Sequence, residues 1–318
     1  MKYFIIIIYS VFQFCFQKTN QAVSGAEAVT LIAAEGRGVL GLDLRVGNMG
    51  WTRGCETRMG NLIADAFAWK SGADIGFING GAVRHDRGVD LIAKGTVLSR
   101  TQLDSFMPFS NTLIGVNLNG YRLKQALEGS VNKLQTGRTA LSFDDNDSDG
   151  PQHGNCYGTV GDLDGSGRIL LFNSRWRVEI NPANSAQTIT GTASDKSLKV
   201  ASEGRRVTGI YFDGRMIYSN SSGDPASGWG TGKTSCTVKG SFFSLSQACS
   251  FYSTVLSDFY AGGGDENPSF NSELAEIAND GTSVGTGKTY GVDKNAILEY
   301  IINFSTYYPR ISGRLVLP

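Results

Sequence analysis

The sequence predicts an α+β fold, in which helices and strands follow one another without the regular strand–helix–strand repeat of a parallel α/β sheet. Some segments alternate apolar and polar side chains with the period of two that is typical of strands, as at 112–119. Others repeat apolar side chains at helical spacing, as Leu123, Leu127 and Val131 do. The chain has 318 residues, of which 41% are hydrophobic, so it can bury a sizeable core.

Local signals predict the elements of the first half. Apolar residues at helical spacing predict a helix over 59–68, and Gly72 ends it. Asn-Gly at 79–80 turns the chain after a short apolar strand. Thr101 caps a helix that ends before Pro108, because the residue before a proline disfavours helical backbone. The predicted elements are strands within 29–50, a helix at 59–68, a strand at 74–79, a helix at 101–106, a strand at 112–119 and a helix at 121–134.

The second half begins with a change of composition. From Thr136 to Arg168 the chain is rich in Asp, Gly, Ser and Asn, which predicts a long surface loop or insertion, 136–168. Apolar and aromatic segments follow it, separated by further glycine- and serine-rich sequence. The predicted elements are strands at 169–180 and 207–217, helices at 245–260 and 294–307, and a last strand at 314–317.

The N-terminus has the features of a signal peptide. Lys2 precedes an apolar stretch from Tyr3 to Phe16, which is too short to span a bilayer comfortably. Ala26-Glu27-Ala28 fits a cleavage site, so residues 1–28 are expected to be a leader and 29–318 the mature domain. We therefore expect a secreted or periplasmic protein whose mature chain has no membrane span. A miscalled start or a buried strand is the alternative.

Cysteine usage is consistent with export. Removal of the leader leaves Cys55, Cys156, Cys236 and Cys249, an even number that suggests one or two disulfides. The sequence alone allows three ways of pairing all four cysteines. The short separation of Cys236 and Cys249 makes them the first candidate pair.

Charge and histidine content exclude several functions. The chain has 29 basic and 29 acidic residues, so it lacks the positive surplus of a nucleic-acid-binding protein. It has two histidines, too few for most metal-hydrolase centres. Asp145, Asp147 and Asp149 alternate before a glycine, as calcium ligands do, but Cys156 stands where an EF-hand loop needs a glutamate. A solvated acidic loop is the alternative to a calcium site.

Three short patches carry the candidate site: 79–84 (NGGAVR), 108–111 (PFSN) and 259–265 (FYAGGGD). Each places an aromatic, Arg, Asn or Asp side chain beside glycines or a turn. Glycine lets a ligand approach the backbone, and an aspartate can accept two hydroxyl protons from a ribose-like diol. Together the patches predict a site for a planar, charged small molecule.

The order of these motifs resembles the C-terminal, substrate-binding domain of the 5'-nucleotidases. The resemblance covers roughly 38–318 and implies a four-layer α/β/β/α sandwich. The family has glycine where Ala82 stands, and Glu266-Asn267 after the glycine-rich patch also departs from its pattern. The matching motifs are Arg53 and Glu56 ahead of 59–66, the three patches, Asn119-Gly120 with 126–128, and Gly313-Arg314-Leu315.

The resemblance also implies a role for each site residue. Two rings would sandwich the base, and polar side chains would bind base, ribose and phosphate. In this sequence the stacking rings are Phe109 and Phe259, the base contact is Asn79, the ribose contact is Asp265, the ribose and phosphate contacts are Arg53 and Arg84, and a further polar contact is Asn111.

The function implied is the binding of a nucleoside 5'-phosphate for hydrolysis by a metallophosphatase domain. That domain carries the family's divalent metals, zinc or similar, and its catalytic histidine, and nothing in this chain matches it. Such a domain would act in trans or belong to a longer gene, so whether this chain is an enzyme stays open. One alternative is a stand-alone exported module that binds nucleosides or nucleotides without catalysis. The other alternative is a structural relic of such a domain, whose pocket has degenerated and no longer binds a ligand.

Overall fold

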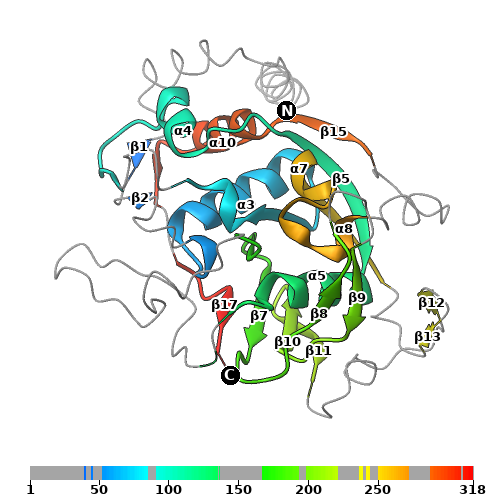
Figure 1. Cartoon of the computed structure of the whole chain (residues 1–318). Helices are drawn as coiled ribbons and strands as arrows, with labels where there is room; N and C mark the ends of the chain where they lie inside the picture. The colour runs from blue at the N-terminus through cyan, green and yellow to red at the C-terminus, as the bar shows by residue number, and fades with distance from the viewer. Residues whose placement is uncertain are drawn as a thin grey trace, which may run out of the picture.

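The computed structural model places two main sheets and their covering helices around one hydrophobic core (Figure 1). It describes residues 39–40, 44–45, 52–84, 91–134, 136, 167–192, 198–220, 236–238, 241–243, 250–271, 287–308 and 311–317. The helices are α3 (Arg58–Ser71), α4 (Arg100–Phe106), α5 (Gly120–Val131), α7 (Asp258–Ala261), α8 (Pro268–Asn271) and α10 (Asp293–Ile302), with short 3₁₀ turns η2 (Gly80–Ala82) and η4 (Gly264–Glu266).

The strands divide between two main sheets and several short pairs. The first main sheet has the order β15 (Thr289–Val292), β5 (Thr112–Asn119), β14 (Phe251–Ser257), β3 (Ile75–Asn79), β6 (Leu170–Phe172). The second has the order β11 (Arg215–Ser219), β10 (Val207–Phe212), β7 (Trp176–Ile180), β17 (Leu315–Val316). The pairs are β1 (Val39–Leu40) with β16 (Thr306–Tyr307), β2 (Leu44–Arg45) with β4 (Leu91–Ile92), β8 (Thr188–Thr190) with β9 (Lys199–Ser202), and β12 (Cys236–Val238) with β13 (Ser241–Phe243).

Helix α3 covers one face of the five-stranded sheet. Thr57 caps its first turn by accepting from Gly60 N, and Gly72 ends it in left-handed backbone with φ of 70°. The helix packs closely on β3, because a β-carbon on Gly76 would lie 2.2 Å from Ala64 O. Helix α10 packs beside α3 in the same layer.

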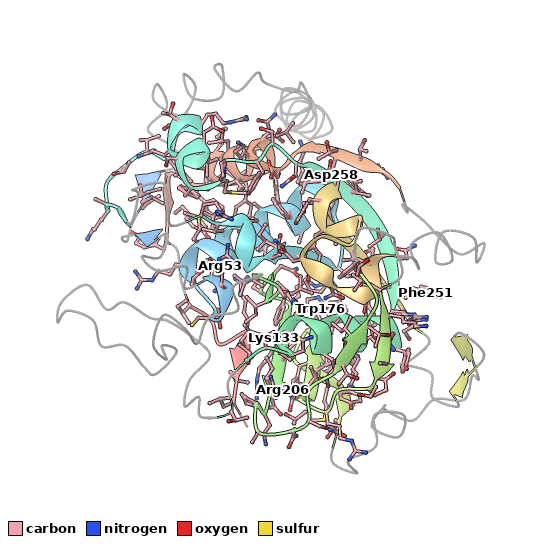
Figure 2. The ribbon with its side chains drawn as sticks, viewed as in Figure 1. Arg53, Lys133, Trp176, Arg206, Phe251 and Asp258 are labelled. Atoms are coloured by element: carbon pink, nitrogen blue, oxygen red, sulfur yellow. The ribbon has the colours of Figure 1, made fainter. Side chains whose placement is uncertain are left out.

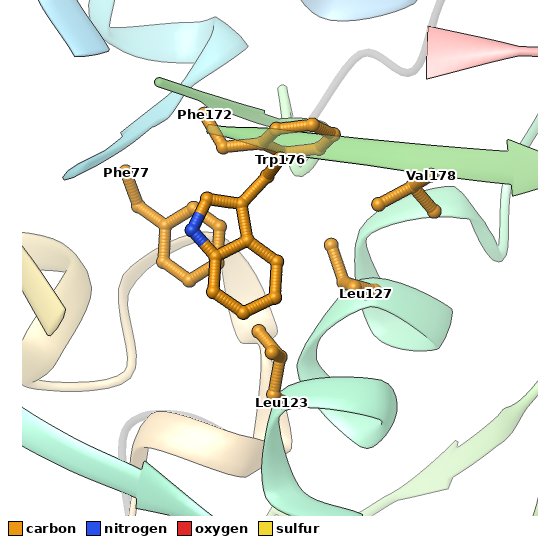
Figure 3. Close-up of a pocket in the computed structure, with 6 residues that line it drawn as sticks. All are labelled: Phe77, Leu123, Leu127, Phe172, Trp176 and Val178. Carbon is orange, nitrogen blue, oxygen red and sulfur yellow. The ribbon is translucent and has the colours of Figure 1, made fainter. Parts of the chain in front are cut away.

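The other face of this sheet meets the four-stranded sheet and α5. Phe77 and Phe172 face Trp176 and Val178, and leucines of α5 close the space between them (Figure 3). The gap among these side chains has no space that admits a water molecule, so it is packed core. The helices α3 and α10 on one face of the five-stranded sheet, and the second sheet packed on the other, confirm the α+β prediction.

Two buried residues named by the resemblance hold distant segments together. The carboxylate of Glu56 accepts from Ser312 N at 2.9 Å, Arg314 N at 2.7 Å and Asn61 Nδ2 at 2.7 Å. Arg314 Nη2 lies 2.7 Å from Asp65 Oδ2. These bonds attach the C-terminal segment to α3, so this part of the motif is structural.

Several predicted elements were wrong. The predicted helix at 245–260 is, over its described residues 250–260, β14 followed by the short α7. The predicted strand at 169–180 is two strands, β6 and β7, which belong to different sheets. The predicted strand at 207–217 is a hairpin, because Asp213 and Gly214 both adopt positive φ, at 49° and 75°.

The remaining corrections concern element ends. Ser99, not Thr101, caps α4, through a reciprocal capping box with Gln102. The last helix ends at Ile302, and Thr306–Tyr307 forms β16. The predictions at 59–68, 74–79, 112–119, 121–134 and 314–317 are confirmed within a few residues at each end.

Candidate functional site

Three strand ends meet at one edge of the five-stranded sheet. β3 and β14 are parallel neighbours, so both end on the same side. β5 is antiparallel to β14, with Ser257 opposite Leu113, so β5 begins where β14 ends. The three patches of the sequence follow or precede these ends: 79–84 after β3, 259–265 after β14 and 108–111 before β5.

A side-chain hydrogen bond joins two of the patches. Asn79 Nδ2 donates to Asp265 Oδ2. The other amide atom, Asn79 Oδ1, is buried and has no hydrogen-bond partner within the part of the chain that the structure describes. Asp265 has a φ of 54°. Left-handed backbone in a residue other than glycine costs on the order of 1–3 kcal/mol and clusters at functional sites.

Glycines allow the turn after β3 to approach its neighbours. Gly81 N donates to Gly167 O at 3.0 Å. A β-carbon on Gly80 would lie 1.9 Å from Thr52 O, and one on Gly167 would lie 2.4 Å from the α-carbon of Gly81. The β-carbon on Gly167 would also lie 3.2 Å from Arg53 Nη1. Arg53 therefore lies beside the turn that carries Asn79.

The two predicted stacking rings are both at the surface. Phe109 is 49% exposed and Phe259 is 53% exposed. The Phe259 ring lies over Gly264, where a β-carbon would be 2.4 Å from ring atom Cε1. A larger residue at 264 would displace the ring. Half-exposed phenylalanines leave apolar surface in water that a bound planar ring can cover.

Backbone hydrogen bonds fix the segments that carry Arg84 and Asn111. Arg84 N donates to Phe106 O at 2.7 Å, and Asp293 N donates to Asn111 O at 3.0 Å. Burial raises the pKa of Asp293 to about 6, while the N–H groups of Lys294 and Asn111 act in the opposite direction. The N-terminus of α10 thus holds the loop that precedes β5.

The structure places all seven predicted residues on segments that reach this sheet edge. Asn79 and Asp265 are in direct contact, and Arg53 lies against the same turn. Sequence reasoning missed Gly167, which lies at the end of the predicted insertion. It also missed Asp293. The one feature of the sequence that could have indicated this residue is its position at the start of a predicted helix.

Metal ligands are not grouped in the described part of the chain. No set of three or more His, Cys, Asp or Glu side chains there is placed to hold a metal ion. The calcium prediction at Asp145, Asp147 and Asp149 lies outside the described residues, as does the leader at 1–28. No described helix has both the length and the apolar character needed to cross a membrane.

Comparison with known proteins identifies the family. The model of the 5'-nucleotidase C-terminal domain matches residues 43–218, more than half of the chain. The chain belongs to the family of 5'-nucleotidase C-terminal domains. The trifunctional nucleotide phosphoesterase YfkN of Bacillus subtilis is 38% identical over 90 residues, which are 27% of this chain and 6% of that protein.

Solved structures show the same fold. A 5'-nucleotidase precursor from Thermus thermophilus superposes with a TM-score of 0.51 at 19% identity, covering 92% of this chain and 41% of that one. A proposed 5'-nucleotidase of Staphylococcus aureus, solved in complex with alpha-ketoglutarate, gives a TM-score of 0.50 at 13% identity, covering 88% and 40%. The chain thus spans less than half the length of these proteins.

Proposed function

We propose that this chain binds the base and ribose of a nucleoside 5'-phosphate at the edge where β3, β5 and β14 meet. The observation that carries the proposal is the buried amide oxygen of Asn79, which has no partner among the described residues and lies beside the Asp265 carboxylate. A buried acceptor left without a donor is unfavourable by about 1–3 kcal/mol. A ligand N–H or O–H would remove that penalty.

The surrounding groups suit the parts of a nucleotide. The exposed rings of Phe109 and Phe259 offer apolar surface to a base. Asp265 is a charged acceptor for ribose hydroxyls, and the guanidinium groups of Arg53 and Arg84 suit phosphate oxygens. We assign Asn111 a further polar contact.

Asp265→Asn tests the ribose contact. Asparagine tolerates left-handed backbone, so the turn is retained while the charged acceptor is lost. We expect AMP, adenosine and ribose 5-phosphate each to bind about 10- to 150-fold more weakly by titration calorimetry, as for loss of a hydrogen bond to a charged group.

Asp213→Asn is the matched control, because Asp213 also has positive φ but lies in the β10–β11 hairpin. Its variant should bind all three ligands as the unaltered chain does. Equal affinities of the Asp265 and Asp213 variants would refute the proposed ribose contact.

Hydrolysis, in this proposal, belongs to a dimetal metallophosphatase domain that receives the phosphate. The described residues offer no set of ligands for such metals, so no metal-dependent step is assigned to them. Binding energy at base and ribose would orient the phosphate for that domain. Rapid release of phosphate from AMP by the purified chain would contradict this division of roles.

We also propose that the protein is exported. The Thermus relative is described as a precursor, and Cys55 is disulfide-bonded, which suits an oxidising compartment. N-terminal sequencing of chain recovered from outside the cytoplasm should begin near Val29. Recovery with Met1 still present would refute cleavage of the leader.

A further inference from the structure

A cleft is lined by residues outside the candidate nucleotide site. It has a volume of about 320 Å³ and lies between α3, the end of α10 and the C-terminal segment. This volume is at the lower end of the range found for small-ligand sites. None of its lining residues is among the seven residues of the candidate nucleotide site.

Aromatic rings form much of its wall. Tyr300 contacts Phe304, Tyr307 and Trp69, with ring centroids 5.3, 6.0 and 5.8 Å apart. Tyr308 lines the cleft and is half exposed. Such rings offer flat apolar faces with polar hydroxyl groups at their edges.

Two tyrosine hydroxyls in the wall form no hydrogen bond with the residues that the structure describes. Tyr307 is only 8% exposed, and no hydrogen bond from its hydroxyl, or from that of Tyr300, is formed within the described residues. Burial raises the pKa of Tyr300 to about 12 and raises that of Tyr307 as well. Both hydroxyls therefore stay protonated at neutral pH and can donate as well as accept.

The charged groups of the cleft neutralise each other. Arg314 Nη2 pairs with Asp65 Oδ2 at 2.7 Å, Nη1 donates to Phe172 O at 2.7 Å, and Nε donates to Ser312 Oγ at 2.8 Å. Because these donors are engaged, the guanidinium is poorly placed to bind a phosphate or carboxylate. The cleft thus suits an uncharged ligand.

We propose that this cleft binds a neutral sugar ring. One face of a pyranose carries C–H groups that pack against an aromatic ring, and its hydroxyls both donate and accept hydrogen bonds. The hydroxyls of Tyr300 and Tyr307, which have no partner among the described residues, match that pattern together with those of Ser174 and Thr306. An aromatic ligand would use the rings but leave this set of hydroxyls without partners.

The test is titration of the full chain with methyl glucoside, methyl galactoside and N-acetylglucosamine, followed by calorimetry and ligand-observed NMR. At least one sugar should bind saturably. Tyr307→Phe and Tyr300→Phe keep the rings and remove the hydroxyls, so each should weaken binding about 3- to 12-fold. Tyr211→Phe, on β10, is the matched control and should leave the affinity unchanged.

The result that supports the proposal is saturable binding that falls in both cleft variants and persists with adenosine at saturation. Absence of saturable binding by all three sugars would overturn it. Binding that Tyr307→Phe and Tyr300→Phe leave unchanged would also overturn it. Displacement of the sugar by adenosine would place it in the nucleotide site and overturn it equally.

Discussion

Lys124→Met is expected to lower the free energy of unfolding by about 3–5 kcal/mol, because it leaves one buried charge without its partner. Lys124 and Glu128 are both fully buried on α5, and Lys124 Nζ lies 3.1 Å from Glu128 Oε1. Lys124 Nζ also donates to Gly204 O at 2.6 Å. Methionine matches the length of the lysine stem but supplies neither the charge nor the donor.

The loss of stability in the Lys124→Met variant should depend on pH. Burial already raises the pKa of Glu128 in the folded chain, and removal of the lysine raises it further. A carboxyl whose folded pKa lies above its unfolded value favours the folded state once it is protonated. The variant should therefore recover stability as the pH falls through the folded pKa of Glu128 and lose it as the pH rises.

Urea denaturation followed by circular dichroism measures both effects. Lys133→Met is the matched control, because Lys133 is exposed just beyond the same helix (Figure 2), and its change should be within about 0.5 kcal/mol. A loss in Lys124→Met no larger than that of the control would show that the pair contributes nothing.

Local signals were sufficient for α3 but not for β14. Helix α3 has a cap at Thr57, a glycine at its end and a helical apolar stripe, and all three agree. In β14, Tyr252, Val255 and Leu256 fit helical spacing as well as a strand, so local sequence does not distinguish the two there. The strand forms because it lies between β5 and β3, where pairing on both edges and burial decide its conformation.

The same distinction separates the two candidate sites. The glycine and aromatic patches were visible in the sequence because each is local. The bond from Asn79 to Asp265 joins residues 186 positions apart, and only the strand register brings them together. The cleft lined by Tyr300 and Tyr307 was not predicted, because both residues were predicted to lie in one helix, which ends between them.

Replacement of either exposed ring should weaken nucleotide binding strongly while leaving the fold intact. Phe109→Ala and Phe259→Ala should each weaken AMP binding about 5- to 150-fold, as for the loss of one aromatic stacking contact to a base. Neither ring is buried in the core, so circular dichroism should show unchanged thermal unfolding. If both rings clamp one base, the double variant should lose less binding free energy than the sum of the single losses.

Ribose 5-phosphate lacks the base, so its affinity distinguishes a loss of stacking from other causes of weaker AMP binding. Its affinity should be the same in both ring variants and the unaltered chain, although Asp265→Asn weakens it. Phe251→Ala is the matched control. Phe251 is 41% exposed and begins β14, whereas Asp258, the neighbour of Phe259, follows the other end of the strand (Figure 2). Its loss should therefore not change AMP binding. Unchanged AMP affinity in the ring variants would exclude stacking, and an equal loss for ribose 5-phosphate would show that the rings only support the loops that carry the polar contacts.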